Sequence, residues 1–177
     1  MALNTPVSGG KVVLTASAAG LYALPIIPQY TAAKHALVGL TRAMAPVAEK
    51  VGIKVNAICP AVVATGLAPE GLLDAFTQEQ MTPMSTIMRA FDELVRFDDL
   101  VVGRGDEVEK RERWVNEGHS GQIVEASIGN LYYREEVEKA DQGQVHMKEG
   151  AADAWAKAYT ERNKNFALMD WMKEKEV

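Results

Sequence analysis

The stretch that decides the fold begins with KVVLTASAAG at residues 11–20. Its first six residues, KVVLTA, form a continuous apolar run, which is typical of a strand buried on both faces. Apolar residues then recur with helical spacing and predict a helix that starts near Tyr30 and ends near Gly52. The run IKVNAI at residues 53–58 predicts a second strand, which Pro60 ends. Strand, helix and strand in this order predict a parallel crossover unit.

The second half of the chain predicts one further helix and one further strand. Thr82 suits an N-cap and Pro83 a first helical residue, which predicts a helix to about Val95. The run QIVEAS at residues 122–127 predicts a third strand. Together these patterns predict an α/β fold, with a partial Rossmann-like parallel sheet of about three strands, flanking helices and an added C-terminal helix.

We expect two regions along the chain. Residues 1–135 form the first, and they include a charged segment near residues 103–119 with little apolar periodicity, as in an inserted loop or a solvated helix. Residues 136–177 form the second, a charged linker followed by an amphipathic helix. Packing or a partner-facing surface explains the stripe on this helix, which contains Trp155, Tyr159, Arg162, Phe166, Met169 and Met172.

Composition narrows the class of protein. The chain has 177 residues, of which 47% are hydrophobic, and this suits one compact domain with a core. The net charge of −5 predicts no nucleic-acid partner, and no apolar run approaches the roughly 20 residues of a membrane-spanning helix. The single cysteine, Cys59, forms no internal disulfide, and we expect a cytoplasmic protein. We predict no metal site, because His35, His119 and His146 are too scattered for ligand spacing.

Three residues near the start of the chain predict a proton-transfer site. Tyr30 and Lys34 are four residues apart at the beginning of the first helix, so they lie on one helix face. A lysine ammonium beside a phenol favours the phenolate form, and the positive end of the helix acts in the same direction. Ser17 follows the first strand, where open α/β sheets bind ligands, and its hydroxyl can hold a substrate oxygen. A tyrosine and a lysine four residues apart usually form an ordinary surface pair. The small residues between Tyr30 and Lys34 and the apolar strands on either side favour a catalytic interpretation of this pair.

These residues resemble the catalytic part of the short-chain dehydrogenase/reductase family. The resemblance is carried by TASAAG with Ser17, by YTAAK with Tyr30 and Lys34, and by VNAICPAVVAT, which ends at Thr65. The run QYTAAKHALVGLTRAMAP is most similar to the 15-hydroxyprostaglandin dehydrogenase type. The resemblance implies an oxidoreductase that uses NAD or NADP and interconverts a hydroxyl and a ketone on a small apolar molecule.

The resemblance also implies a role for each matching residue. Tyr30 would transfer the proton, Ser17 would orient the carbonyl, and Lys34 would assist Tyr30 and bind the nicotinamide ribose. Val63, through its backbone, and Thr65, through its hydroxyl, match positions that hold the nicotinamide carboxamide and a nearby phosphate in the family.

The family's glycine-rich turn has no counterpart in this sequence, so we expect a truncated catalytic half. The adenylate part of the cofactor has roughly two dozen heavy atoms at up to about 0.3 kcal/mol each. Losing all of their contacts would cost on the order of 7 kcal/mol, or about five powers of ten in affinity. We therefore expect weak cofactor binding and impaired activity.

Two other classes of function remain open from the sequence. A cofactor-free enzyme or lyase could use Ser17 and Tyr30 for proton transfer. A non-catalytic, dimeric binding protein could use its tail helix to pair with another chain. We also expect a homo-oligomer, because the first strand would present an apolar edge that the tail helix or a second chain must cover.

Overall fold

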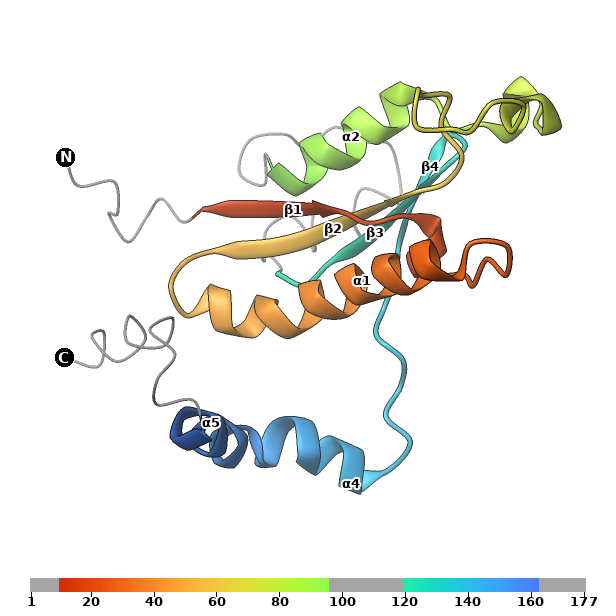
Figure 1. Cartoon of the computed structure of the whole chain (residues 1–177). Helices are drawn as coiled ribbons and strands as arrows, with labels where there is room; N and C mark the ends of the chain where they lie inside the picture. Colours follow the sequence, from red (N-terminus) through yellow and green to blue (C-terminus); the bar gives the residue numbers. More distant parts are fainter. Residues whose placement is uncertain (1–9, 96–119, 163–177) are drawn as a thin grey trace. The chain divides into compact units, whose positions relative to one another are not determined.

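A computed structural model describes residues 10–95 and 120–162 of the chain (Figure 1). The chain divides into two compact units, Met1–Glu135 and Glu136–Val177. The charged segment predicted near residues 103–119, and the part of the tail stripe beyond residue 162, lie outside the described residues. No helix in the described part of the chain is long and apolar enough to cross a membrane.

The first unit contains a four-stranded sheet in the order β1-β2-β3-β4. Strands β1 (Lys11–Thr15), β2 (Lys54–Pro60) and β3 (Ile123–Ser127) are parallel, and β4 (Asn130–Tyr133) is antiparallel to β3. The predicted α/β fold and its parallel strands are confirmed. The predicted number of strands is too low, because β4 was not recognised from the sequence.

A two-residue turn explains why β4 was missed. Ser127 pairs with Asn130, so Ile128 and Gly129 form the whole connection between β3 and β4. Ile128 adopts a φ of 53°, a left-handed conformation that β-branched residues rarely take. The sequence Ile128-Gly129 also differs from the Asn-Gly and Asp-Gly pairs that are typical of two-residue hairpin turns. The hairpin was therefore not indicated by its sequence.

The threonines at the start of α2 (Met84–Val95) hold this turn in place. The Ile128 N–H donates to Thr82 Oγ1 at 2.9 Å, and Thr86 Oγ1 donates to the Ile128 carbonyl at 3.0 Å. The helix begins at Met84, one residue after the predicted Pro83. Thr82 was predicted as the helix cap, whereas its side-chain oxygen binds the hairpin turn.

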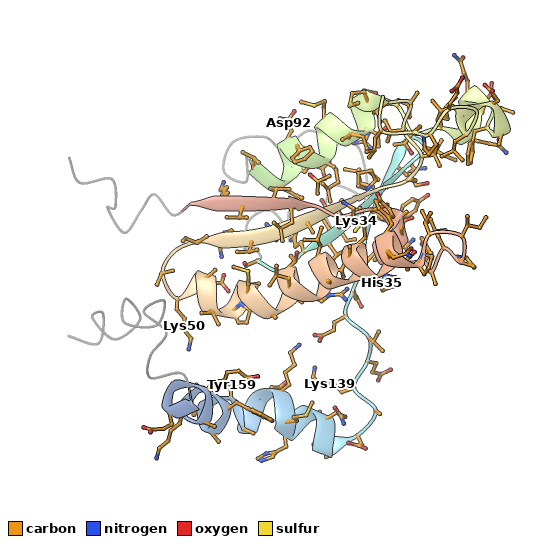
Figure 2. The ribbon with its side chains drawn as sticks, viewed as in Figure 1. Lys34, His35, Lys50, Asp92, Lys139 and Tyr159 are labelled. Atoms are coloured by element: carbon orange, nitrogen blue, oxygen red, sulfur yellow. The ribbon has the colours of Figure 1, made fainter. Side chains whose placement is uncertain are left out.

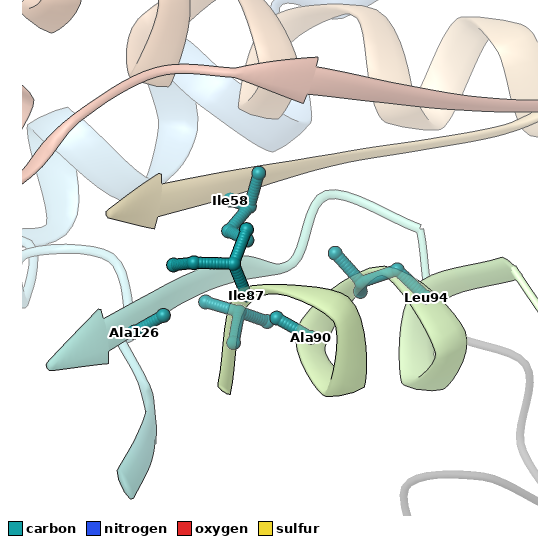
Figure 3. Packing of buried hydrophobic residues seen from close by; sticks show 6 residues of the cluster. Ile58, Ile87, Ala90, Leu94 and Ala126 are labelled. Carbon is teal, nitrogen blue, oxygen red and sulfur yellow. The ribbon is translucent and has the colours of Figure 1, made fainter. Parts of the chain in front are cut away.

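Helix α1 (Pro28–Glu49) is the predicted crossover between β1 and β2, and it covers one face of the sheet while α2 covers the other (Figure 1). On the α2 side, an apolar group that we call the α2 cluster packs without exposed members: Ile58, Ile87, Ala90, Leu94, Val124 and Ala126 (Figure 3). On the α1 side, Val38 of α1 packs against Ala16, Ala57, Cys59 and Ile123. Because side chains alternate along a strand, Ile58 and Cys59 of β2 serve opposite faces.

The second unit is helical in its described part. It contains α4 (Gln142–Val145), a π-helical turn (His146–Gly150) and α5 (Ala152–Arg162), which is the added C-terminal helix. The rings of Trp155 and Tyr159 lie 6.4 Å apart on α5, and these side chains are 53% and 52% exposed.

Candidate active site

All five predicted site residues lie near the carboxyl ends of the parallel strands. Ser17 follows β1, Val63 and Thr65 follow β2, and Tyr30 lies in the first turn of α1. Helix α1 begins at this edge because the crossover must return from the end of β1 to the start of β2. Ligands of open α/β sheets bind outside this edge, so the topology places the predicted residues where a site is expected.

Ser17 is fixed at the start of a short 3-10 turn, η1 (Ala18–Gly20). Its Oγ accepts a hydrogen bond from the Ala19 N–H at 3.1 Å, which caps the turn, and the residue is half-buried. A hydroxyl that accepts a bond keeps its own proton for donation. Ser17 can therefore donate to a substrate carbonyl oxygen without losing its cap.

Gly20 allows η1 to pack against α1. A Cβ atom built on Gly20 would lie 2.6 Å from the Lys34 carbonyl oxygen, which is closer than real Cβ contacts. Glycine is therefore the only residue that allows the backbone of η1 to lie this close to the Lys34 carbonyl without a backbone shift. The contact fixes the distance between the turn that begins at Ser17 and the helical turn that carries Lys34.

The structure brings Tyr30 and Lys34 together. Lys34 Nζ lies 5.4 Å from the centre of the Tyr30 ring, and it donates to the carbonyl of Thr15, the last residue of β1, at 2.9 Å. Figure 2 shows Lys34 in the part of α1 beside the end of β1. An ammonium group has three donors, so Lys34 can bind a ligand as well as Thr15. Tyr30 is 36% exposed, which leaves its ring accessible to a substrate.

In the part of the chain that the structure describes, side-chain hydrogen bonds do not join the predicted site residues to one another. Within the described ranges, no hydrogen bond joins the Tyr30 hydroxyl to Ser17 or Lys34, and none joins Val63 or Thr65 to these three residues. Val63 is half-buried and packs beside the α2 cluster. Thr65 is exposed, and its Oγ1 accepts from the Leu67 N–H at 3.4 Å.

Cys59 lies in β2 next to Ser17 but is not exposed. Burial raises the pKa of its thiol to about 11, although the Ser17 backbone N–H acts in the opposite direction. The thiol is therefore protonated at neutral pH and is a poor nucleophile. Cys59 is therefore a buried packing residue of the α1 side.

A polar network that the sequence patterns did not indicate lies close to the site. The carboxylate of Glu125 in β3 accepts hydrogen bonds from Tyr22 Oη at 3.0 Å and from Arg134 Nε at 2.6 Å. The Glu125 carboxylate raises the pKa of Tyr22 by accepting a hydrogen bond from its hydroxyl, and it raises the pKa of Arg134 in the same way. The available signal was a single glutamate within the otherwise uncharged strand QIVEAS.

Comparison with known proteins finds a family match over one part of the chain. Residues 3–72 match the sequence profile of a family described as short chain dehydrogenase. This stretch is similar to members of the short-chain dehydrogenase/reductase family. All five predicted site residues fall within it.

Two curated relatives show the extent of the similarity. A short-chain dehydrogenase/reductase of Penicillium rubens is 35% identical over 135 residues, which are 76% of this chain and 48% of that protein. The 2,5-dichloro-2,5-cyclohexadiene-1,4-diol dehydrogenase of Sphingobium indicum is 52% identical over 56 residues, which are 32% of this chain and 22% of that protein. The chain thus spans less than half the length of these relatives.

Solved structures of dehydrogenases are also similar to this chain. A short chain dehydrogenase from Mycobacterium avium matches with a TM-score of 0.49 and 23% sequence identity, over 77% of this chain and 40% of that chain.

Proposed function

We propose that this chain carries the proton-transfer site of a nicotinamide-dependent oxidoreductase, which interconverts a hydroxyl and a ketone on a small apolar molecule. The observation that carries the proposal is the Tyr30–Lys34 pair, with Nζ 5.4 Å from the ring centre, at the strand edge that also holds Ser17. The match of residues 3–72 to a family described as short chain dehydrogenase supports this chemistry.

Tyr30, Lys34 and Ser17 have different tasks in the proposed reaction. Tyr30 exchanges the proton with the substrate oxygen, and the Lys34 ammonium stabilises the phenolate that forms. Ser17 donates to the same substrate oxygen and holds it near Tyr30. The bound cofactor, NAD or NADP, would supply or accept the hydride.

The described residues fit the nicotinamide end of the cofactor. Lys34 offers ammonium donors to ribose hydroxyls, and the backbone of Val63 and the hydroxyl of Thr65 offer polar groups at the same edge. The described residues fit the pyrophosphate of the cofactor less well than they fit its nicotinamide end. Gly20 is the only glycine in the connection from β1 to α1, and it packs against the Lys34 carbonyl instead of leaving space for a phosphate. We therefore propose that this chain binds the cofactor weakly and mainly through its nicotinamide end.

Titration with NADH, NADPH and reduced nicotinamide mononucleotide tests the cofactor proposal. The mononucleotide lacks the adenylate, and we expect it to bind within about tenfold of NADH, that is, within about 1.4 kcal/mol. A Lys34→Met variant should weaken all three ligands, whereas Lys50→Met, at the far end of α1, should not change binding. Absence of saturable binding by all three ligands would contradict the proposal.

The cofactor requirement of turnover separates the three classes of function. An apolar secondary alcohol and its ketone, 2-octanol and 2-octanone, serve as probes. Turnover that requires NAD(P) is the expected result. Proton exchange into the ketone without any nicotinamide would favour a cofactor-free enzyme or lyase, and a stable dimer without ligand binding would favour a binding protein.

Three further properties belong to this proposal. We propose the 15-hydroxyprostaglandin dehydrogenase type, because of the run QYTAAKHALVGLTRAMAP. We propose a reducing, cytoplasmic compartment, which suits the buried free thiol of Cys59. We also propose a homo-oligomer, because Leu40, Met44 and Val47 recur with helical spacing on α1 and are 42–46% exposed.

A further inference from the structure

We propose that Glu125, acting through Tyr22 and Arg134, is a positioning residue for the segment that carries Ser17 and Tyr30. We call these three residues the Glu125 network. They come from three places in the first unit: β3, the connection between β1 and α1, and the residue that follows β4. The catalytic consequence rests on the proposed function, whereas the contacts themselves do not depend on it.

The network is a closed set of hydrogen bonds around a buried carboxylate. Glu125 is 5% exposed and lies on the α1 side of the sheet, since Ile123, two residues earlier, packs against α1. Its Oε2 accepts from Tyr22 Oη and from Arg134 Nε, and it is paired with Arg134 Nη2. Arg134 Nη2 also donates to Tyr22 Oη at 2.7 Å. Each member therefore contacts both others, and a shift of Tyr22 would break two bonds to charged groups.

Arg134 is itself held from several sides. Its guanidinium carbon lies 5.9 Å from the centre of the Tyr22 ring and 5.4 Å from that of Tyr132. Arg42 of α1 donates to the carbonyls of Arg134 and Glu135 at 3.2 and 2.9 Å. The chain that follows β4 is thus bonded to the same helix that carries Tyr30 and Lys34. These contacts fix the position of Arg134, which in turn bonds to Tyr22.

The segment around Tyr22 makes hydrogen bonds through its backbone to the turn that Ser17 caps and to the residue that follows Tyr30. Its N–H donates to the Ala18 carbonyl at 2.8 Å, within the turn that Ser17 caps. Two residues later, the Leu24 N–H donates to Thr31 Oγ1 at 3.2 Å, and this hydroxyl donates to the Leu24 carbonyl at 3.3 Å. Thr31 follows Tyr30 in the first turn of α1.

These contacts explain how a residue outside the site can affect it. Ser17 and Tyr30 must both reach one substrate oxygen, and their separation depends on the twelve residues between them. A displacement of about 1 Å in an active site can reduce the rate by about 10²-fold. The Glu125 network holds the middle of this segment and so limits how far its two ends can move.

The test compares Tyr22→Phe with Tyr132→Phe. Both variants remove one hydroxyl from a ring that contacts Arg134, but only Tyr22 bonds to Glu125. The chain has five tyrosines, so ¹³C labelling at tyrosine Cζ gives a simple spectrum, and a Tyr30→Phe protein assigns the Tyr30 signal. We expect Tyr22→Phe to shift the Tyr30 signal and Tyr132→Phe to leave it unchanged.

Amide hydrogen exchange gives a second readout that needs no activity. We expect amides in residues 18–27 to exchange at least about tenfold faster in Tyr22→Phe, because a hydrogen bond to a charged group is lost, while amides of β2 keep their rates. Arg134→Lys keeps the charge but loses the planar fork, and it should change exchange in the same segment. The proposal is overturned by an unchanged Tyr30 signal and unchanged exchange in Tyr22→Phe, or by equal changes in Tyr132→Phe.

Turnover then connects the network to catalysis. With 2-octanone as the probe, kcat of Tyr22→Phe should fall about tenfold while KM for the cofactor stays constant, because the substitution alters the reacting geometry and not the cofactor contacts. An equal rise in KM with constant kcat would contradict a positioning role. If the unmodified chain has no turnover, the proposed function fails, while the tyrosine signal and hydrogen exchange still decide this inference.

Discussion

The α2 cluster and the Glu125 network occupy opposite faces of the same sheet, and they are held by different forces. The α2 cluster consists of apolar side chains that exclude water, among them Ile58 and Leu94 with no exposed surface. The Glu125 network is held by hydrogen bonds around one buried charge. Apolar burial is non-directional, whereas hydrogen bonds fix distances and angles. We infer from this comparison that the α2 cluster mainly stabilises the fold, whereas the Glu125 network mainly positions the candidate site.

Truncation within the α2 cluster should give the largest loss of stability. We expect Leu94→Ala to lower the free energy of unfolding by about 3 kcal/mol, because it removes buried methyl groups and leaves a cavity. Urea denaturation measures the loss. In the remaining folded protein the Tyr30 signal should be unchanged, and a shifted signal would show that the two faces are not separate.

Gly20→Ala should destabilise the α1 face by a smaller amount. The added Cβ would lie 2.6 Å from the Lys34 carbonyl, so the turn or the helix must shift, at a cost of about 2 kcal/mol. Because the shift moves Ser17 relative to Lys34, we expect turnover to fall even under conditions in which the variant remains fully folded. Gly39→Ala on α1, where a Cβ meets no atom within 4 Å, is the matched control. Full activity of Gly20→Ala would refute the packing argument.

Alkaline pH should weaken the α1 face through Cys59. Its folded-state pKa of about 11 lies above the 9.0 of an unperturbed thiol, so the folded state retains the thiol proton more strongly than the unfolded state does. This stabilisation is complete below pH 9 and is lost between pH 9 and 11, and the loss is about 1.4 kcal/mol at pH 10. The difference in unfolding free energy between the unmodified chain and Cys59→Ala, measured from pH 8 to 11, isolates this effect. A constant difference would contradict a buried thiol.

Thr82→Val should give the smallest effect, a loss of about 1 kcal/mol. The substitution removes the acceptor of the Ile128 N–H, which lies in the left-handed turn between β3 and β4. Hydrogen exchange at Ile128 should accelerate, while the amides of residues 18–27 keep their rates. Equal acceleration in both segments would mean that the hairpin turn and the site segment open together.

Sequence patterns predicted the elements with regular periodicity and missed those that depend on distant contacts. The apolar runs of β1 and β2 and the spacing along α1 were sufficient, because local burial patterns determine these elements. Strand β4 was missed because Ile128 adopts a left-handed conformation, and hydrogen bonds with Thr82 and Thr86, over 40 residues away, hold this turn. Tertiary contacts of this kind leave no local pattern.

The candidate site shows the same limit. Tyr30 and Lys34 were predicted to be neighbours from their spacing, and the helix brings them together. The tie from Tyr22 to Glu125, 103 residues apart, could not be predicted, because it depends on the position of β3 beside β2. Motifs thus indicated the residues that we propose for the chemistry, whereas the residues that we propose to position them could be found only from the structure.

The most direct test of the proposed chemistry is the NAD(P)-dependent turnover of Tyr30→Phe beside Tyr132→Phe and the unmodified chain. We expect Tyr30→Phe to lose at least about 100-fold in kcat, because the proton donor is removed, and Tyr132→Phe to retain the rate of the unmodified chain. Full cofactor-dependent turnover by Tyr30→Phe would contradict the central claim that this tyrosine transfers the proton.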